Sequence, residues 1–143
     1  MSATDRLRLI LHGAIVLLAG LLSGFPTVVE AMQGEAPRYW HTAHEALIMM
    51  GIWMLAASSL LPVLVLAKRE ARVLMWSLYA MGYGFVVALV LGGAIGVSPF
   101  SPGDTPASVV AFAAATLGIG GAVIAAALTL MGAAAALKAS RGP

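Results

Sequence analysis

Four long apolar segments, separated by short polar breaks, account for most of the sequence. They cover residues 7–25, 42–67, 73–97 and 107–137. Each is long enough for an α-helix to cross the hydrocarbon core of a bilayer, which takes roughly 20 residues. Because the apolar runs are continuous and do not alternate with polar residues, they favour helices over the strands of a membrane barrel. The pattern predicts an all-α integral membrane protein, in which residues 1–143 form a single four-helix transmembrane domain.

Prolines and small polar residues mark where these helices are expected to begin and end. Asp104 or Thr105 can cap the last helix, with Pro106 in its first turn, where the missing N–H leaves no hydrogen bond unmade. Pro62 lies late in the second helix and is expected to kink it near its end.

The composition agrees with the membrane interpretation. Hydrophobic residues make up 61 % of the chain and charged residues only 10 %, whereas soluble domains usually carry about 25 % charged residues. The sequence contains no cysteine, which excludes disulfides, thiolate chemistry and iron–sulfur clusters. The net charge of +2 does not indicate nucleic acid as a partner, because the basic residues lie between apolar segments. We therefore expect the lipid bilayer to surround the protein.

The positions of Lys and Arg predict the orientation of the chain. With four crossings, seven of these residues fall on one side and only Arg38 on the other; the seven are Arg6, Arg8, Lys68, Arg69, Arg72, Lys138 and Arg141. Basic residues concentrate on the cytoplasmic side of membrane proteins, so both termini are expected in the cytoplasm, with a bacterial inner membrane as the setting. Alternatively, RLRL and the apolar run after it form a cleaved signal peptide, which would leave three helices and disturb this charge pattern.

Small residues recur at helical spacing. Gly20 and Gly24 form one small-xxx-small pair, Gly92 and Gly96 form another, and the last apolar segment is rich in alanine and glycine. Small residues let helix backbones approach closely in membranes. These positions predict packing within the bundle or an interface between subunits.

Few polar groups are available for chemistry inside the membrane, where ionisable residues are costly and often functional. They are His12, His41, His44, Glu45, Tyr79 and Tyr83. His44 shares a helix face with Leu47, Ile48, Gly51 and Leu55, a smooth apolar wall with a glycine where a flat ligand could approach. A haem group needs such a wall beside an axial imidazole, although packing alone also produces this pattern. For His12, a hydrogen bond to a nearby carbonyl is the structural alternative to a functional role.

His41 and Glu45 lie four residues apart and can pair on the helix surface. Such a pair would lower the cost of the carboxylate at the membrane interface; alternatively, Glu45 orients an imidazole or handles a proton. The sequence has too few carboxylates and lacks the His and Glu spacings of a di-iron or zinc centre.

Several motifs along the chain resemble those of a known family. They are LHGAIVLLAGLLSG in the first helix, RYWHTAHEALIMMG opening the second, LLPVL and EARVL around the next loop, and SPGDTPASVVAFAAATLG in the last third. With the spacing of His44, Pro62 and Arg72, these motifs resemble the styrene oxide isomerases over most of the chain. The resemblance implies a four-helix membrane protein that forms trimers, with haem b held between neighbouring subunits. In that family the ferric iron acts as a Lewis acid and rearranges an epoxide to an aldehyde.

The resemblance places the family's axial histidine on His44. Met50 stands where the family has an asparagine that positions the epoxide, and Leu89 where it has a tyrosine. Tyr83 is not expected to replace that tyrosine, because six residues separate it from Leu89 by about 9 Å along the helix and about 120° around it. No catalytic side chain is therefore assigned. The predicted cofactor-binding residues are His44, Leu47, Ile48, Met50, Gly51 and Leu89, with His44 as the metal ligand.

Two functions follow from these residues. In the first, the protein is a haem b-dependent isomerase that accepts a small apolar ligand or epoxide, because an open ferric site can activate an epoxide without the two lost polar groups. In the second, it binds haem without isomerase activity, as an electron carrier, a gas or redox sensor, or a haem store. Met50 would then serve as the sixth iron ligand, as a thioether does in cytochromes c, and would reach the haem from a neighbouring subunit of the homotrimer.

Overall fold

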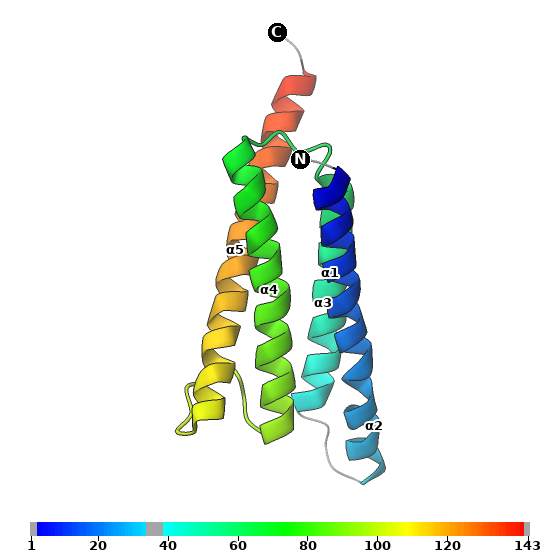
Figure 1. Ribbon diagram of the computed structural model, residues 1–143, viewed down its shortest axis with the longest axis vertical. Coiled ribbons are helices and arrows are strands. Elements are labelled where there is room, and N and C mark those ends of the chain that lie inside the picture. Colours follow the sequence, from blue (N-terminus) through cyan, green and yellow to red (C-terminus); the bar gives the residue numbers. More distant parts are fainter. Residues whose placement is uncertain (1–2, 34–38, 142–143) are drawn as a thin grey trace.

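The computed structural model describes residues 3–33 and 39–141, which form five helices and contain no strand (Figure 1). The helices are α1 (Ala3–Leu22), α2 (Gly24–Met32), α3 (Tyr39–Leu60), α4 (Lys68–Ile95) and α5 (Pro106–Ser140). Helix α2 continues the direction of α1, and together they make one candidate span of 30 residues. Four spans are long and apolar enough to cross a membrane, which confirms the predicted all-α four-helix membrane bundle.

The first span runs further than the sequence predicted. It reaches Met32, whereas its apolar segment was expected to end at Phe25. The helix is interrupted at Ser23, three residues before Pro26. Proline lacks an N–H, and its ring crowds the carbonyl four residues earlier, which here belongs to Leu22. This proline explains why α2 is offset from α1 without leaving the span.

Helix α3 is shorter than predicted at its carboxyl end. It begins at Tyr39 and ends at Leu60, so the expectation that it would continue to residue 67 with only a kink at Pro62 is wrong. Pro62 cannot donate to the carbonyl of Ser58, and the chain turns there before a non-helical connection to α4. The backbone N–H of Val65 donates to the carbonyl of Gly132 at 3.2 Å, which ties this connection to α5.

The ends of α4 and α5 follow local chemistry. Thr105 caps α5 by accepting from the backbone N–H of Ser108 at 3.2 Å, and Pro106 opens the helix. This confirms the predicted cap and assigns it to Thr105. Gly96 ends α4 in the left-handed conformation, with φ of 67°, which glycine adopts without steric cost. Helix α4 begins five residues before its predicted segment, at Lys68.

The helices pack as two antiparallel pairs, α1 with α3 and α4 with α5, joined where α3 and α1 meet α4. Among the described helices, α5 contacts only α4. The core lies between α1, α3 and α4; its largest fully buried side chains are Leu9, Leu47, Met54, Leu74, Leu78, Met81 and Val16. Large apolar side chains also cover the outside of the bundle, as expected where lipid replaces water.

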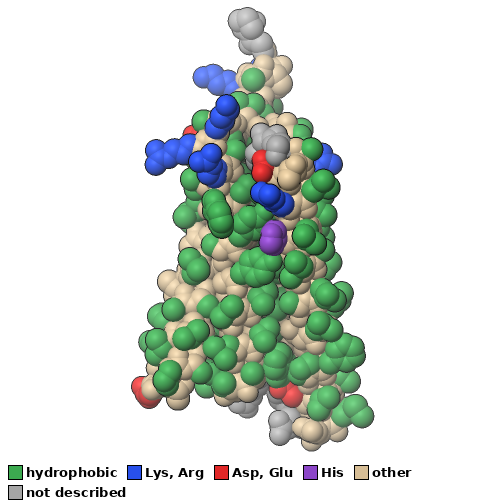
Figure 2. Space-filling view, viewed as in Figure 1, with side chains coloured by type: hydrophobic (Ala, Val, Ile, Leu, Met, Phe, Trp, Pro, Cys, Tyr) green, Lys and Arg blue, Asp and Glu red, His purple; other side chains and the backbone are tan. Residues whose placement is uncertain are grey.

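The two described ends of the chain lie at the same end of the bundle (Figure 1). Lys and Arg side chains gather there, while hydrophobic side chains cover the middle of the visible face (Figure 2). A chain that crosses the membrane an even number of times has both ends on the same side, as seen here. The cytoplasmic location of that end stays a prediction from the charge pattern.

Candidate functional site

His44 lies in the second turn of α3 and packs against the junction of α1 and α2. Its Nδ1 is 2.8 Å from the backbone carbonyl oxygen of Gly20. The Nδ1–Cε1 edge of the ring also lies over Gly24, where an added Cβ would come within 3.0 Å of both atoms. The glycine pair recognised in the sequence therefore makes room for the imidazole, while Gly20 also lies close to the backbone of Ile48.

The hydrogen bond to Gly20 decides which ring nitrogen of His44 is free. A carbonyl oxygen can only accept, so Nδ1 carries the proton and a neutral ring keeps its lone pair on Nε2. Nε2 makes no hydrogen bond to any described residue. Histidines that bind metals commonly donate their second nitrogen to a backbone carbonyl in this way, which fixes both the tautomer and the ring orientation.

A shallow pocket of about 290 Å³ adjoins His44 on the outside of the bundle. Apart from the histidine it is lined by residues of α1 and α2, namely Leu21, Gly24, Phe25, Thr27 and Val28. Phe25 and Val28 are 70 % and 57 % exposed. Pockets for small molecules and cofactors usually enclose about 300–1,000 Å³, so this open pocket lies at the lower limit of that range.

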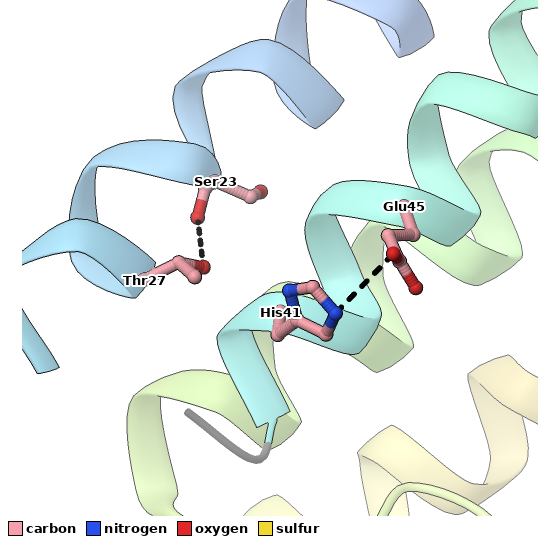
Figure 3. A network of polar contacts seen from close by, with 4 residues as sticks. All are labelled: Ser23, Thr27, His41 and Glu45. Atoms are coloured by element: carbon pink, nitrogen blue, oxygen red, sulfur yellow. Dashed lines mark hydrogen bonds and ion pairs between the residues drawn. The ribbon is translucent and has the colours of Figure 1, made fainter. Parts of the chain in front are cut away.

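The break between α1 and α2 shapes this wall. The Ser23 hydroxyl donates to the carbonyl of Ala19 at 2.8 Å, and the Thr27 hydroxyl donates to the carbonyl of Ser23 at 3.2 Å. Figure 3 shows Ser23 and Thr27 bonded across the break, beside the first turns of α3. Both hydroxyls are thus occupied by the backbone, and the pocket presents mainly hydrocarbon.

None of the other predicted site residues lines this pocket. Leu47 is fully buried, and Gly51 lies against α1, where an added Cβ would come within 2.6 Å of the backbone nitrogen of Leu17. The interpretation of Gly51 as the approach point for a flat ligand is therefore wrong, because α1 already occupies that position. Met50 is partly buried against the hydrophobic core.

Leu89 does not line the pocket of His44. It is 2 % exposed and borders a separate cavity of about 150 Å³, together with Tyr39, Thr42, Gly93 and the segment 98–100. Sequence reasoning instead missed Leu21, Phe25 and Val28 as neighbours of His44. The Gly20/Gly24 pair was the one signal that pointed to this part of α1 and α2.

The predicted pair of His41 and Glu45 is confirmed. Their Nε2 and Oε1 atoms are 3.2 Å apart, and the side chains are 51 % and 65 % exposed. Figure 3 shows the pair on the surface of α3 near its first turn. Glu30 on α2 was not identified as a candidate from the sequence. Its Oε2 is buried without a hydrogen-bond partner among the described residues.

His12 lies on α1 towards the other end of the bundle, where Tyr79 and Tyr83 approach it from α4. Its Nδ1 is 2.6 Å from the Tyr83 hydroxyl, and its ring meets the edge of Tyr79 at a centroid distance of 4.6 Å. The expected carbonyl partner of His12 is therefore replaced by a phenol. Tyr83 contacts His12 and not His44, in agreement with its predicted separation from His44.

No three His, Cys, Asp or Glu side chains converge within residues 3–33 and 39–141 in a way that could hold a metal ion. A bare ion needs several protein ligands, whereas haem brings four nitrogens of its own and requires one axial imidazole. The donor set at His44, a single imidazole with a fixed tautomer beside an apolar wall, fits the second kind of site.

A family model described as styrene oxide isomerase matches residues 5–134, which is most of the chain. No curated protein and no solved structure shows significant similarity to the sequence.

Proposed function

The chain belongs to the styrene oxide isomerase family, and on that premise we propose that it binds haem b through His44 and isomerises epoxides to carbonyl compounds. The observation that carries the proposal is the hydrogen bond from His44 Nδ1 to the Gly20 carbonyl. It leaves Nε2 as the free nitrogen and directs the imidazole from α3 to the α1–α2 wall.

The ferric iron of bound haem would supply a Lewis acid that polarises the epoxide oxygen. The residues of this chain would hold the cofactor and shape its surroundings. His44 would bind the iron through Nε2, while its hydrogen bond to the Gly20 carbonyl holds the ring in place. Leu21, Phe25 and Val28 would form an apolar wall beside the cofactor and limit the access of water, which would protect a reactive epoxide from hydrolysis to a diol.

The pocket at His44 also supports assembly into a trimer with the cofactor between protomers. Its wall is open and about 290 Å³ in volume, and large apolar side chains lie exposed around it. A neighbouring copy of the chain would provide the second wall, as symmetric oligomers commonly do. Purification in mild detergent should give a single oligomeric species of three protomers that retains haem; a monomer that keeps its haem would contradict this assembly.

The competing function is a haem protein without isomerase activity, in which Met50 of a neighbouring subunit binds the iron. Within the chain, Met50 is partly buried against the hydrophobic core. Apolar packing is the common use of methionine. This packing favours an open coordination position, and therefore the isomerase.

The test is to incubate the purified ferric protein with styrene oxide and a set of aliphatic epoxides and to measure carbonyl products. The wild type and His41→Ala should form product, while His44→Ala should form none. Absence of product with every epoxide, together with a low-spin spectrum that Met50→Ala converts to high spin, would establish the non-isomerase function instead.

A further inference from the structure

A second polar site lies at the other end of the bundle from His44, between α1 and the first turns of α4. A cavity of about 670 Å³ opens there, which we term the basic cavity. Three of its lining side chains are cationic, Arg8, Lys68 and Arg72, against one carboxylate, Asp5. The rings of His12, Trp76 and Tyr79 also line it. The proposed isomerase site uses none of these residues.

A second hollow continues from the basic cavity along the outside of the bundle. It lies between α4 and α5 and has a volume of about 660 Å³; we term it the α4–α5 groove. Arg72 and Trp76 border both spaces, so the two meet at these side chains. The rest of the groove is lined mainly by small and aliphatic residues, among them Leu117, Gly120 and Ile124.

We propose that the basic cavity and the α4–α5 groove together bind one anionic phospholipid. Its phosphate would lie among the cationic side chains, and one acyl chain would extend along the groove. Basic pockets at the ends of membrane helices attract anionic headgroups, and arginine binds phosphate through two parallel hydrogen bonds. Trp76 is 66 % exposed at the junction, which is the position that tryptophan takes at the level of lipid headgroups.

The combination of charge and hydrocarbon selects this ligand over others. A free phosphate ion would use the cations and leave the groove unfilled. A zwitterionic lipid would bring a positive group close to Arg8, Lys68 and Arg72, and that repulsion would weaken its binding. A second copy of the chain in the groove would place its own apolar surface there and would not require an anion.

The experiment measures lipid binding to the purified, delipidated protein in detergent by native mass spectrometry and by thermal unfolding. The probes are phosphatidylglycerol, phosphatidylcholine and inorganic phosphate. We expect one tightly bound phosphatidylglycerol per protomer and a Tm increase of roughly 5 °C or more at saturation. Phosphatidylcholine and phosphate should each give much smaller changes. Equal effects of the two lipids, or of phosphate alone, would overturn the proposal.

Two arginines of the same helix turn provide a matched comparison. Arg72 lines both spaces, whereas Arg69 is exposed and lines neither. Arg72→Gln should weaken phosphatidylglycerol binding about tenfold or more, the loss expected for a hydrogen bond to a charged group, while Arg69→Gln should retain it. Equal losses in the two variants would show that only the general positive charge of this end matters.

The groove is tested separately at Gly120, where an added Cβ meets nothing within 4 Å. Gly120→Leu would place its side chain in the groove, and it should weaken the binding of phosphatidylglycerol. Ala126→Leu serves as the control, because Ala126 is exposed on α5 and does not line the groove. Dissociation of the oligomer by Gly120→Leu in lipid-free detergent would instead identify the groove as a subunit interface and overturn the proposal.

Discussion

Replacing Gly51 with alanine is expected to force α1 away from α3 and to destabilise the bundle. The added Cβ would lie 2.6 Å from the backbone nitrogen of Leu17 and 2.7 Å from its Cα. Carbon atoms pack at about 3.5–4.0 Å, so the helices must separate by roughly 1 Å. Overpacking of this kind typically costs about 1–3 kcal/mol. The higher helix propensity of alanine offsets about 1 kcal/mol of that cost, which leaves a net loss of up to about 2 kcal/mol.

Gly120→Ala provides the control, because the same methyl group meets nothing within 4 Å on α5. Its propensity gain should appear without a packing cost, as a stabilisation of up to about 1 kcal/mol. The free energy of unfolding of both variants would be measured in mixed micelles by denaturant titration followed by circular dichroism. A Gly51→Ala variant as stable as Gly120→Ala would refute the close approach of α1 and α3 at this position.

Three further predictions concern other parts of the chain. Tyr83→Phe removes the hydroxyl at 2.6 Å from His12 and should cost about 1 kcal/mol of unfolding free energy without changing the haem spectrum; a spectral change would link this end of the bundle to the iron. Thr105→Ala should destabilise the protein by about 1 kcal/mol through loss of the α5 cap, and unchanged denaturant stability would show that the cap is dispensable. A reporter fused to the C-terminus should be active in the cytoplasm, whereas activity outside it would reverse the predicted orientation.

Features that depend on residues within a few positions of one another were predictable from the sequence. The cap at Thr105 requires only the following proline and Ser108, and the pair of His41 and Glu45 requires only helical spacing. The number of spans likewise follows from the lengths of the apolar runs. The cap and the ion pair each join residues three or four positions apart, so the local sequence is sufficient to predict them.

Helix ends near prolines were less predictable, because proline has more than one outcome in a membrane helix. At Pro26 the helix is offset and then continues to Met32, while at Pro62 the helix ends. Nothing in either proline distinguishes the two outcomes. The difference lies in the surroundings: the chain after Pro62 is held by a bond from Val65 to Gly132, a contact across 67 positions that α5 provides.

The candidate site was predictable at its centre and not at its walls. His44 stood out because imidazoles are rare in apolar segments, and the Gly20/Gly24 pair marked a close approach of helices. The packing of α1 against α3 brings His44 to this glycine pair. It also determines that Nδ1 is the ring nitrogen bonded to Gly20. The same packing explains why the face containing Leu47 and Gly51 is closed: α1 covers it, and the wall beside His44 comes from α1 and α2 instead.

The most direct test of His44 as the haem ligand is an absorption spectrum of the purified protein in its ferric and ferrous states, compared with His44→Ala and His41→Ala. The wild type and His41→Ala should show a Soret band with a five-coordinate ferric spectrum, because Nε2 of His44 is free to bind iron and Met50 is partly buried against the hydrophobic core. His44→Ala should lose the band or retain only a small fraction of it. Full haem retention by His44→Ala, or loss of haem in His41→Ala alone, would contradict His44 as the ligand.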